Sequence, residues 1–96
     1  MYFEWDPEKA TSNLGKHKVS FNEAATVFED PLSFTVPDPA HSEEEQRLIT
    51  IGASAQGRLL MVAHTEQGDR LRLISARTLT RSERKAYEEE ISRRRR

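Results

Sequence analysis

The chain has 96 residues, no cysteine and a formal net charge of −1, so disulfides, thiolate metal sites and cysteine nucleophiles are excluded and a single domain over residues 1–96 is expected. No apolar run is long enough to span a bilayer and the first residues are charged, which excludes a signal peptide and favours a cytoplasmic protein without membrane contact. Ten acidic groups against three lysines make residues 1–46 acidic, whereas twelve basic groups against six acidic ones make residues 47–96 basic.

The first third of the chain predicts a short strand and two helices. Residues 2–5 are strand formers, and Asp6 followed by Pro7 is typical of a helix start, so we expect a helix from Pro7 to His17. Ser20 with Glu23 three residues later forms a capping-box pattern, followed by apolar residues at helical spacing. This pattern predicts a second helix that ends near Glu29, before a proline.

The remainder predicts a sheet and a closing helix. Residues 32–36 suit an edge strand because prolines follow them, and residues 41–45 suit a loop or a helical turn. Runs at 47–53, 58–66 and 70–77 are separated by short gaps that contain glycine, which predicts an antiparallel meander. Thr80 and Glu83 form a second capping-box pattern, and the arginines at 93–96 are expected to fray. The expected fold class is α+β, with the helices largely on one face of a mainly antiparallel sheet.

The basic half favours a partner that bears phosphate. Eleven of its twelve cations are arginines, whose planar guanidinium matches phosphate oxygens. Side-chain alternation predicts that Arg77 ends an otherwise apolar face of the last strand, near Arg81 and Arg84. In the strand before it, Arg58, His64 and Glu66 are expected to project from one face. Each of these residues, taken alone, is more often an ordinary surface or buried polar side chain, so the prediction depends on the cluster.

Several linked segments occur in order over residues 3–88: Phe3-Glu4-Trp5-Asp6-Pro7, Asn13 with Lys16-His17, Val19-Ser20-Phe21 with Glu23-Ala24, Val27-Phe28 with Asp30-Pro31, Ile51-Gly52 with Ser54, Gly57-Arg58, Ile74-Ser75-Ala76-Arg77, Thr80-Arg81 with Glu83-Arg84, and Tyr87-Glu88. Together these segments resemble the BrnT toxin family. One departure is Lys18, where the family usually has glycine, at a position that suits a left-handed helix end.

The resemblance implies a fold, an activity and a set of partners. It implies a RelE-like ribonuclease fold with two N-terminal helices and one C-terminal helix, and a toxin that inhibits translation by cleaving RNA. It further implies a hetero-oligomer with a BrnA-like ribbon-helix-helix antitoxin, through which the complex would contact operator DNA.

The site expected from these residues is a metal-independent endoribonuclease site with no cofactor. Such a reaction needs a base, an acid and cations that stabilise charge on phosphorus. His17 is the leading acid or base because histidine changes charge nearest neutral pH. We expect the site to form one concave anion pocket. The expected catalytic residues are Lys16, His17, Arg58, Glu66 and Arg77, and the expected substrate-binding residues are His64, Arg72, Arg81 and Arg84; Glu66 or His64 is the reserve base.

Two other classes of function remain open at this stage. A nucleic-acid-binding module without catalysis would use the same arginines to hold phosphates and would leave RNA intact. A protein-interaction subunit would use its basic half to bind an acidic partner and would have little affinity for RNA alone.

Overall fold

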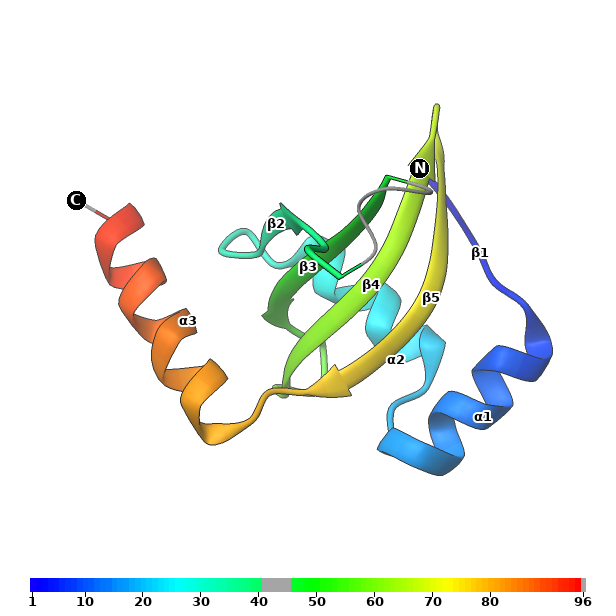
Figure 1. Ribbon diagram of the computed structural model, residues 1–96, viewed down its shortest axis with the longest axis horizontal. Helices are drawn as coiled ribbons and strands as arrows, with labels where there is room; N and C mark the ends of the chain where they lie inside the picture. The colour runs from blue at the N-terminus through cyan, green and yellow to red at the C-terminus, as the bar shows by residue number, and fades with distance from the viewer. Residues whose placement is uncertain (41–45, 96) are drawn as a thin grey trace.

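Five strands form one sheet in the computed structural model of the chain, which describes residues 1–40 and 46–95 (Figure 1). The strands lie in the order β1-β5-β4-β3-β2, with β1 parallel to β5 and the other neighbours antiparallel. Their bounds are β1 Tyr2–Glu4, β2 Phe34–Pro37, β3 Arg47–Ala53, β4 Leu59–Gln67 and β5 Arg70–Thr78. The expected α+β class and the antiparallel meander are confirmed, while the predicted loop or turn at residues 41–45 lies outside the described residues.

Helix α1, Pro7–His17, begins and ends as the sequence predicts. The Asp6 carboxylate accepts a hydrogen bond from the Glu8 N–H at 2.9 Å. At the other end, Lys18 adopts the left-handed conformation, with φ 58° and ψ 33°, and its N–H donates to the Leu14 carbonyl. The inference that this position suits glycine is therefore confirmed, and lysine adopts the left-handed turn there.

Helix α2, Phe21–Thr26, continues into the 3₁₀ turn η1, Val27–Glu29. The Ser20 hydroxyl accepts from the Glu23 N–H at 3.0 Å, as predicted. The other half of the predicted capping box is wrong, because the Glu23 carboxylate binds Ser54 and Arg58 instead of the backbone of Ser20. By contrast, Thr80 and Glu83 form the complete capping box at the start of α3, Arg81–Arg94.

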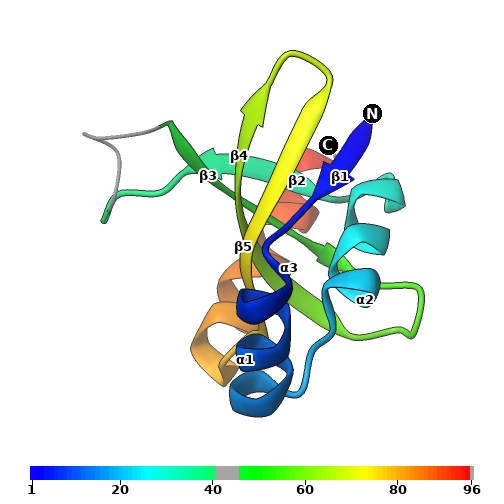
Figure 2. The same ribbon diagram turned by 90° about the vertical axis from the view of Figure 1, so that its right-hand side faces the viewer.

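The hydrophobic core lies between the N-terminal helices and one face of the sheet. In Figure 2, α1 stands in front of the strands and α3 lies behind them. The core consists of apolar residues from the segment of α2 and its flanking turns and from the two longest strands, β4 and β5: Val19, Phe21, Ala24, Val27, Leu60, Val62, Leu71, Leu73 and Ala76. Among the helices of the described residues, α3 is the one that lies against the opposite face of the sheet. No helix in the described part of the chain is long and apolar enough to cross a membrane.

A β-bulge changes which face of the sheet Arg77 occupies. Ala63 pairs with Ser75 while His64 pairs with Leu73, so Ile74 is an extra residue in β5. Simple alternation, which placed Arg77 on the face of Leu73, is therefore wrong beyond the bulge. Arg77 instead pairs with Met61 and faces α3.

Candidate active site at one end of the sheet

The predicted site residues separate into two groups at opposite ends of β4. The first group surrounds the start of β4 and the end of β5: Lys16, His17, Arg58, Arg77, Arg81 and Arg84. The second lies toward the β4–β5 turn: His64, Glu66 and Arg72. A strand rises about 3.3 Å per residue, so Leu59 and Glu66 lie roughly 23 Å apart. The expectation that His64 and Glu66 lie beside Arg58 is therefore wrong.

The Arg58 guanidinium is fixed on two sides. Its Nε donates to Glu23 Oε2 at 2.9 Å, and its Nη2 donates to Glu23 Oε1 and to the Lys18 carbonyl at 2.5 and 2.9 Å. Within the described residues, its Nη1 has no hydrogen-bond partner. The Arg58 side chain is 37% exposed and the Glu23 side chain is 3% exposed. Arg58 therefore presents a free N–H₂ group from a fixed position.

The Glu23 carboxylate is buried and fixes the position of the Arg58 guanidinium. Oε2 also accepts a hydrogen bond from the Ser54 hydroxyl at 2.7 Å. The hydrogen bonds from Arg58 lower the pKa of Glu23 against the opposing effect of burial, and the same contact raises the pKa of Arg58. Both groups therefore stay charged at neutral pH, and the geometry of Arg58 does not depend on pH in that range.

Lys16 and His17 occupy the last turn of α1, the end of the helix that Arg58 contacts. The Lys18 carbonyl that accepts from Arg58 immediately follows them in the chain. Both side chains are exposed, and neither has a hydrogen-bond or ion-pair partner among the residues that the structure describes. The end of α1 thus supplies an ammonium and an imidazole that are free to meet a substrate beside the fixed guanidinium.

Arg77 is more fully engaged than Arg58. Its Nη1 and Nη2 each donate to one oxygen of Glu83 at 2.8 Å, and Nη1 also donates to the Thr78 carbonyl. The bond from Arg77 lowers the pKa of Glu83 to about 2. Arg58 binds Glu23 of α2 and Arg77 binds Glu83 of α3, and Figure 1 shows these two helices on opposite sides of the sheet, so the expected single pocket is not formed by these two arginines. Arg81 and Arg84 are both exposed and lie in the first turn of α3, the helix that Arg77 contacts through Glu83.

His64 lies in the core and does not contact the surface. Its relative exposure is 0%, its Nε2 is 2.7 Å from the Thr50 hydroxyl oxygen, and its ring packs edge-on against Phe28. Nδ1 lies 3.6 Å from Glu66 Oε2 and makes no hydrogen bond to any residue that the structure describes. Burial lowers the pKa of His64 to about 4, so the ring is neutral at pH 7. The expectation that His64 binds substrate is therefore corrected, because the side chain is inaccessible.

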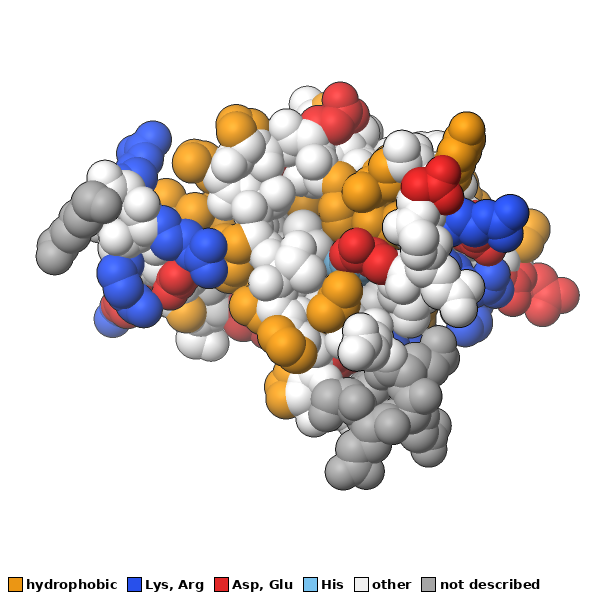
Figure 3. All heavy atoms as spheres, turned by 90° about the horizontal axis from the view of Figure 1, so that it is seen from above, with side chains coloured by type: hydrophobic (Ala, Val, Ile, Leu, Met, Phe, Trp, Pro, Cys, Tyr) orange, Lys and Arg blue, Asp and Glu red, His pale blue; other side chains and the backbone are white. Residues whose placement is uncertain are grey.

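Arg72 lies in a small charged cluster at the same end of the molecule as His64. It donates to Glu4 at 3.3 Å, and a hollow of about 130 Å³ is lined by Glu4, Thr65, Gln67, Arg70 and Arg72. Figure 3 views the molecule from this end and shows basic and acidic side chains gathered at the right. The cluster is separate from Arg58, and its charges are partly balanced internally.

Sequence reasoning missed Glu23, Ser54 and Glu83 as residues that hold the arginines. Glu23 and Arg58 are 35 residues apart, and no local pattern records that contact. Glu83 was recognised as a helix cap, but its second contact with Arg77 depends on the face that the bulge selects. In the described residues, no group of three or more histidines and carboxylates could hold a metal ion.

Comparison with known families decides the class of protein. The profile of the family described as "Ribonuclease toxin, BrnT, of type II toxin-antitoxin system" matches residues 5–83. The chain belongs to the BrnT family. As a BrnT protein it is a ribonuclease toxin of a type II toxin–antitoxin system, and such a system implies an antitoxin partner. The catalytic reading is thereby favoured over a binding module that leaves RNA intact.

A solved structure supports the fold of this BrnT protein. The 1.1 Å crystal structure of the Brucella abortus ribonuclease toxin BrnT is similar to it with a TM-score of 0.66 and 24% sequence identity, covering 84% of this chain and 99% of that chain. No curated protein sequence matches significantly.

Proposed function

We propose that this BrnT protein cleaves RNA without a metal ion at the end of the sheet where Arg58 meets α1. The observation that carries the proposal is the fixed guanidinium of Arg58: among the described residues its Nη1 has no hydrogen-bond partner, and its Nη2 binds the backbone carbonyl of Lys18, the residue that follows Lys16 and His17. A cation held in place before the substrate arrives stabilises developing charge without a cost of reorganisation. Loss of cellular RNA would then inhibit translation and arrest growth.

The reaction needs no group beyond those of the RNA and these side chains. The 2′-hydroxyl attacks the adjacent phosphorus while neutral His17 takes its proton, and the phosphorus–oxygen bond to the 5′ carbon's oxygen breaks. The Lys16 ammonium gives a proton to that leaving oxygen, and Arg58 stabilises the extra negative charge on the phosphate. The products are a 2′,3′-cyclic phosphate and a 5′-hydroxyl, so the reaction balances as a transfer within the RNA.

The other arginines near this end of the sheet would help to bind the RNA. Arg81 and Arg84 hold the RNA backbone through their exposed charge, and Arg77 adds positive potential while it anchors α3 through Glu83. Glu66, His64 and Arg72 are outside the proposed site because they lie at the other end of β4.

The proposal is tested with purified protein, end-labelled RNA and excess EDTA. We expect cleavage to persist in EDTA and to give cyclic phosphate ends. His17→Ala and Lys16→Ala should each lower the rate by roughly 10²–10⁴-fold, as expected for loss of a general base or acid. Lys9→Ala, at the far end of the same helix, is the matched control and should cleave at the wild-type rate.

Three results would contradict this proposal. Cleavage that stops in EDTA and returns with a divalent cation would show that a metal is required. Linear 3′-phosphate formed without a cyclic intermediate would exclude the 2′-hydroxyl as nucleophile. A folded His17→Ala protein that cleaves at the wild-type rate would exclude His17 as the base.

The proposed partners follow from the same family assignment. We propose a BrnA-like ribbon-helix-helix antitoxin, a cytoplasmic hetero-oligomer, and contact with operator DNA through the antitoxin. Expression of the toxin with and without the product of the neighbouring reading frame tests this set. Growth arrest that the second product relieves, together with a complex of both on a sizing column, is the expected result. Unrelieved arrest would contradict it.

A further inference from the structure

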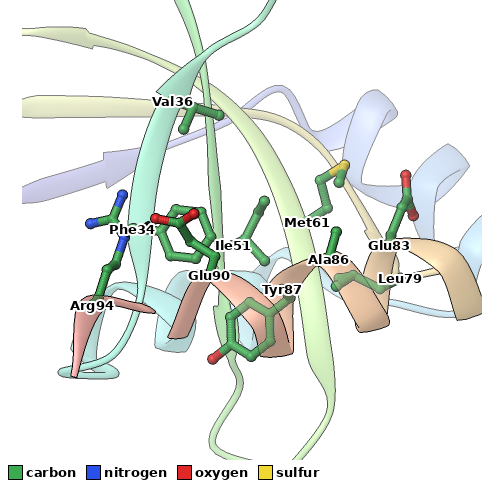
Figure 4. A pocket seen from close by; sticks show the side chains of 10 residues that line it. All are labelled: Phe34, Val36, Ile51, Met61, Leu79, Glu83, Ala86, Tyr87, Glu90 and Arg94. Atoms are coloured by element: carbon green, nitrogen blue, oxygen red, sulfur yellow. Dashed lines mark hydrogen bonds and ion pairs between the residues drawn. The ribbon is translucent and has the colours of Figure 1, made fainter. Parts of the chain in front are cut away.

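A groove separates α3 from the sheet. It has a volume of about 350 Å³, and its walls are mostly apolar (Figure 4). The sheet contributes Phe34, Val36, Ile51 and Met61, the chain before α3 contributes Leu79, and α3 contributes Glu83, Ala86, Tyr87, Glu90 and Arg94. The close-up shows side chains of the strands and of α3 facing the same space. This face of the sheet is therefore incompletely covered.

Helix α3 is held to the sheet by few contacts. The Tyr87 ring stacks on Phe34 with centroids 5.9 Å apart, the Arg94 guanidinium lies 4.5 Å from the Phe34 ring centroid, and Glu83 binds Arg77. None of the described residues of α3 is buried, and Ala86 is exposed although it lines the groove. The two faces of the sheet thus differ, because the face toward α1 and α2 contains the buried core.

The charge around the groove favours an acidic occupant. Both carboxylates that line it are already paired, Glu83 with Arg77 and Glu90 with Arg93 and Arg94. Two arginines, Arg93 and Arg94, share the single carboxylate of Glu90, while the exposed Glu88 and Glu89 of the same helix do not line the groove, so the groove's own rim keeps cationic character there. Figure 3 shows lysine and arginine side chains gathered at the left, where α3 ends, with acidic side chains among them. An apolar floor with a cationic rim complements a helix or strand that carries apolar side chains flanked by carboxylates.

We propose that this groove is the docking surface for the antitoxin. A segment of the antitoxin inserts apolar side chains between α3 and the sheet, and its acidic side chains pair with the arginines at the C-terminal end of α3. The proposal rests on the toxin–antitoxin assignment of the family and identifies where that partner binds. The groove reaches Glu83, the partner of Arg77, so a docked segment ends close to the proposed RNA-binding end of the sheet.

The test fills the groove without disturbing the core. Ala86 is exposed, so Ala86→Trp adds a large side chain inside the groove, while Ser92→Trp adds the same side chain at an exposed position of α3 that does not line it. The probe is the purified antitoxin from the neighbouring reading frame, and the measurement is its dissociation constant. Ala86→Trp should weaken binding by roughly 30-fold or more, the effect of blocking a central contact. Ser92→Trp should leave binding within about twofold of wild type.

The charged part of the surface has its own pair of variants. Arg94→Gln removes the groove-lining cation and should weaken antitoxin binding by roughly 3–10-fold, while Arg95→Gln removes an exposed cation outside the groove and should change it less than about twofold.

The toxin alone is measured in parallel for RNA cleavage, which Ala86→Trp should retain. Wild-type antitoxin affinity in the folded Ala86→Trp protein would overturn the docking proposal and leave the proposed catalysis standing. A toxin-only dimer that Ala86→Trp dissociates would also overturn it, because the groove would then bind a second copy. Absence of cleavage by the wild-type protein would count against the proposed function alone.

Discussion

Two arginines at one end of the sheet differ in what their guanidinium groups can still bind. Nη1 of Arg58 has no hydrogen-bond partner within residues 1–40 and 46–95, whereas both terminal nitrogens of Arg77 are bonded to Glu83. The buried Glu23 carboxylate makes this difference, because it aligns Arg58 without covering its exposed end. At the scale of single residues, a fixed cation with one unused donor group is what a phosphate site requires.

Lys18 predicts a simple stabilising substitution. Its φ of 58° is costly for a side chain with a Cβ but not for glycine, so Lys18→Gly should raise the free energy of unfolding by roughly 0.5–1 kcal/mol. The Lys18 carbonyl, which accepts from Arg58, is retained. Urea denaturation measures the change. Lys9→Gly, inside α1, is the opposite control and should lower stability by up to about 1 kcal/mol. A loss of stability in Lys18→Gly would contradict the assigned turn.

His64 predicts a pH dependence of stability. Its folded pKa is about 4, below the ordinary value of 6.5, so the unfolded chain binds the proton first as the pH falls. The contribution of neutral, buried His64 is complete above pH 6.5 and is lost as the pH falls toward 4. Between about pH 6.5 and pH 4.5 the free energy of unfolding should drop by roughly 2 kcal/mol through this group.

The variant for this effect is His64→Gln, which removes the buried imidazole. Urea titrations at several pH values should show a flatter profile for His64→Gln than for the wild type. Equal slopes for wild type and His64→Gln over this range would show that His64 does not carry the effect.

At the scale of elements, Asn13 joins α1 to the sheet. Its Nδ2 donates to the Val19 and Ala76 carbonyls at 2.9 Å, and its Oδ1 accepts from the Ala76 N–H at 3.0 Å. Asn13→Ala leaves three buried backbone groups without these partners, which should cost roughly 2–4 kcal/mol of stability. Asn22→Ala removes the same side chain from an exposed position and should cost less than about 0.5 kcal/mol. Similar losses for the two variants, measured by thermal or urea denaturation, would contradict the anchoring role.

The elements themselves were predictable where the chain signals them locally. Asp6 and Pro7 predict the start of α1, and Gly57 and Gly68, both at positive φ, occupy the turns that join the antiparallel strands. The bulge at Ile74 has no comparable local signal, because it depends on how β4 and β5 pair. The face occupied by Arg77 was therefore predicted wrongly, although the strand that carries it was predicted correctly.

At the scale of the whole molecule, the acidic and basic halves partly neutralise each other. Glu23 pairs with Arg58, and Glu4 pairs with Arg70 and Arg72, in each case linking the front half of the chain to the back half. Part of the opposite charge of the two halves is thus engaged in ion pairs within the chain, which composition alone does not reveal. The predicted site residues lie at two ends of β4 for a related reason. Contacts between residues far apart in the sequence, together with the length of β4, decide which arginines lie near one another.

The most direct test of the active-site position compares the RNA cleavage rates of variants at the two ends of β4. Arg58→Lys keeps a positive charge that can pair with Glu23 but loses the spare Nη1 group, so the rate should fall by roughly 100-fold or more. Arg72→Lys makes the same exchange in the cluster around Glu4 and should cleave within about twofold of wild type. A folded Arg58→Lys protein that cleaves as fast as wild type, or an Arg72→Lys protein that loses activity instead, would contradict the placement of the active site.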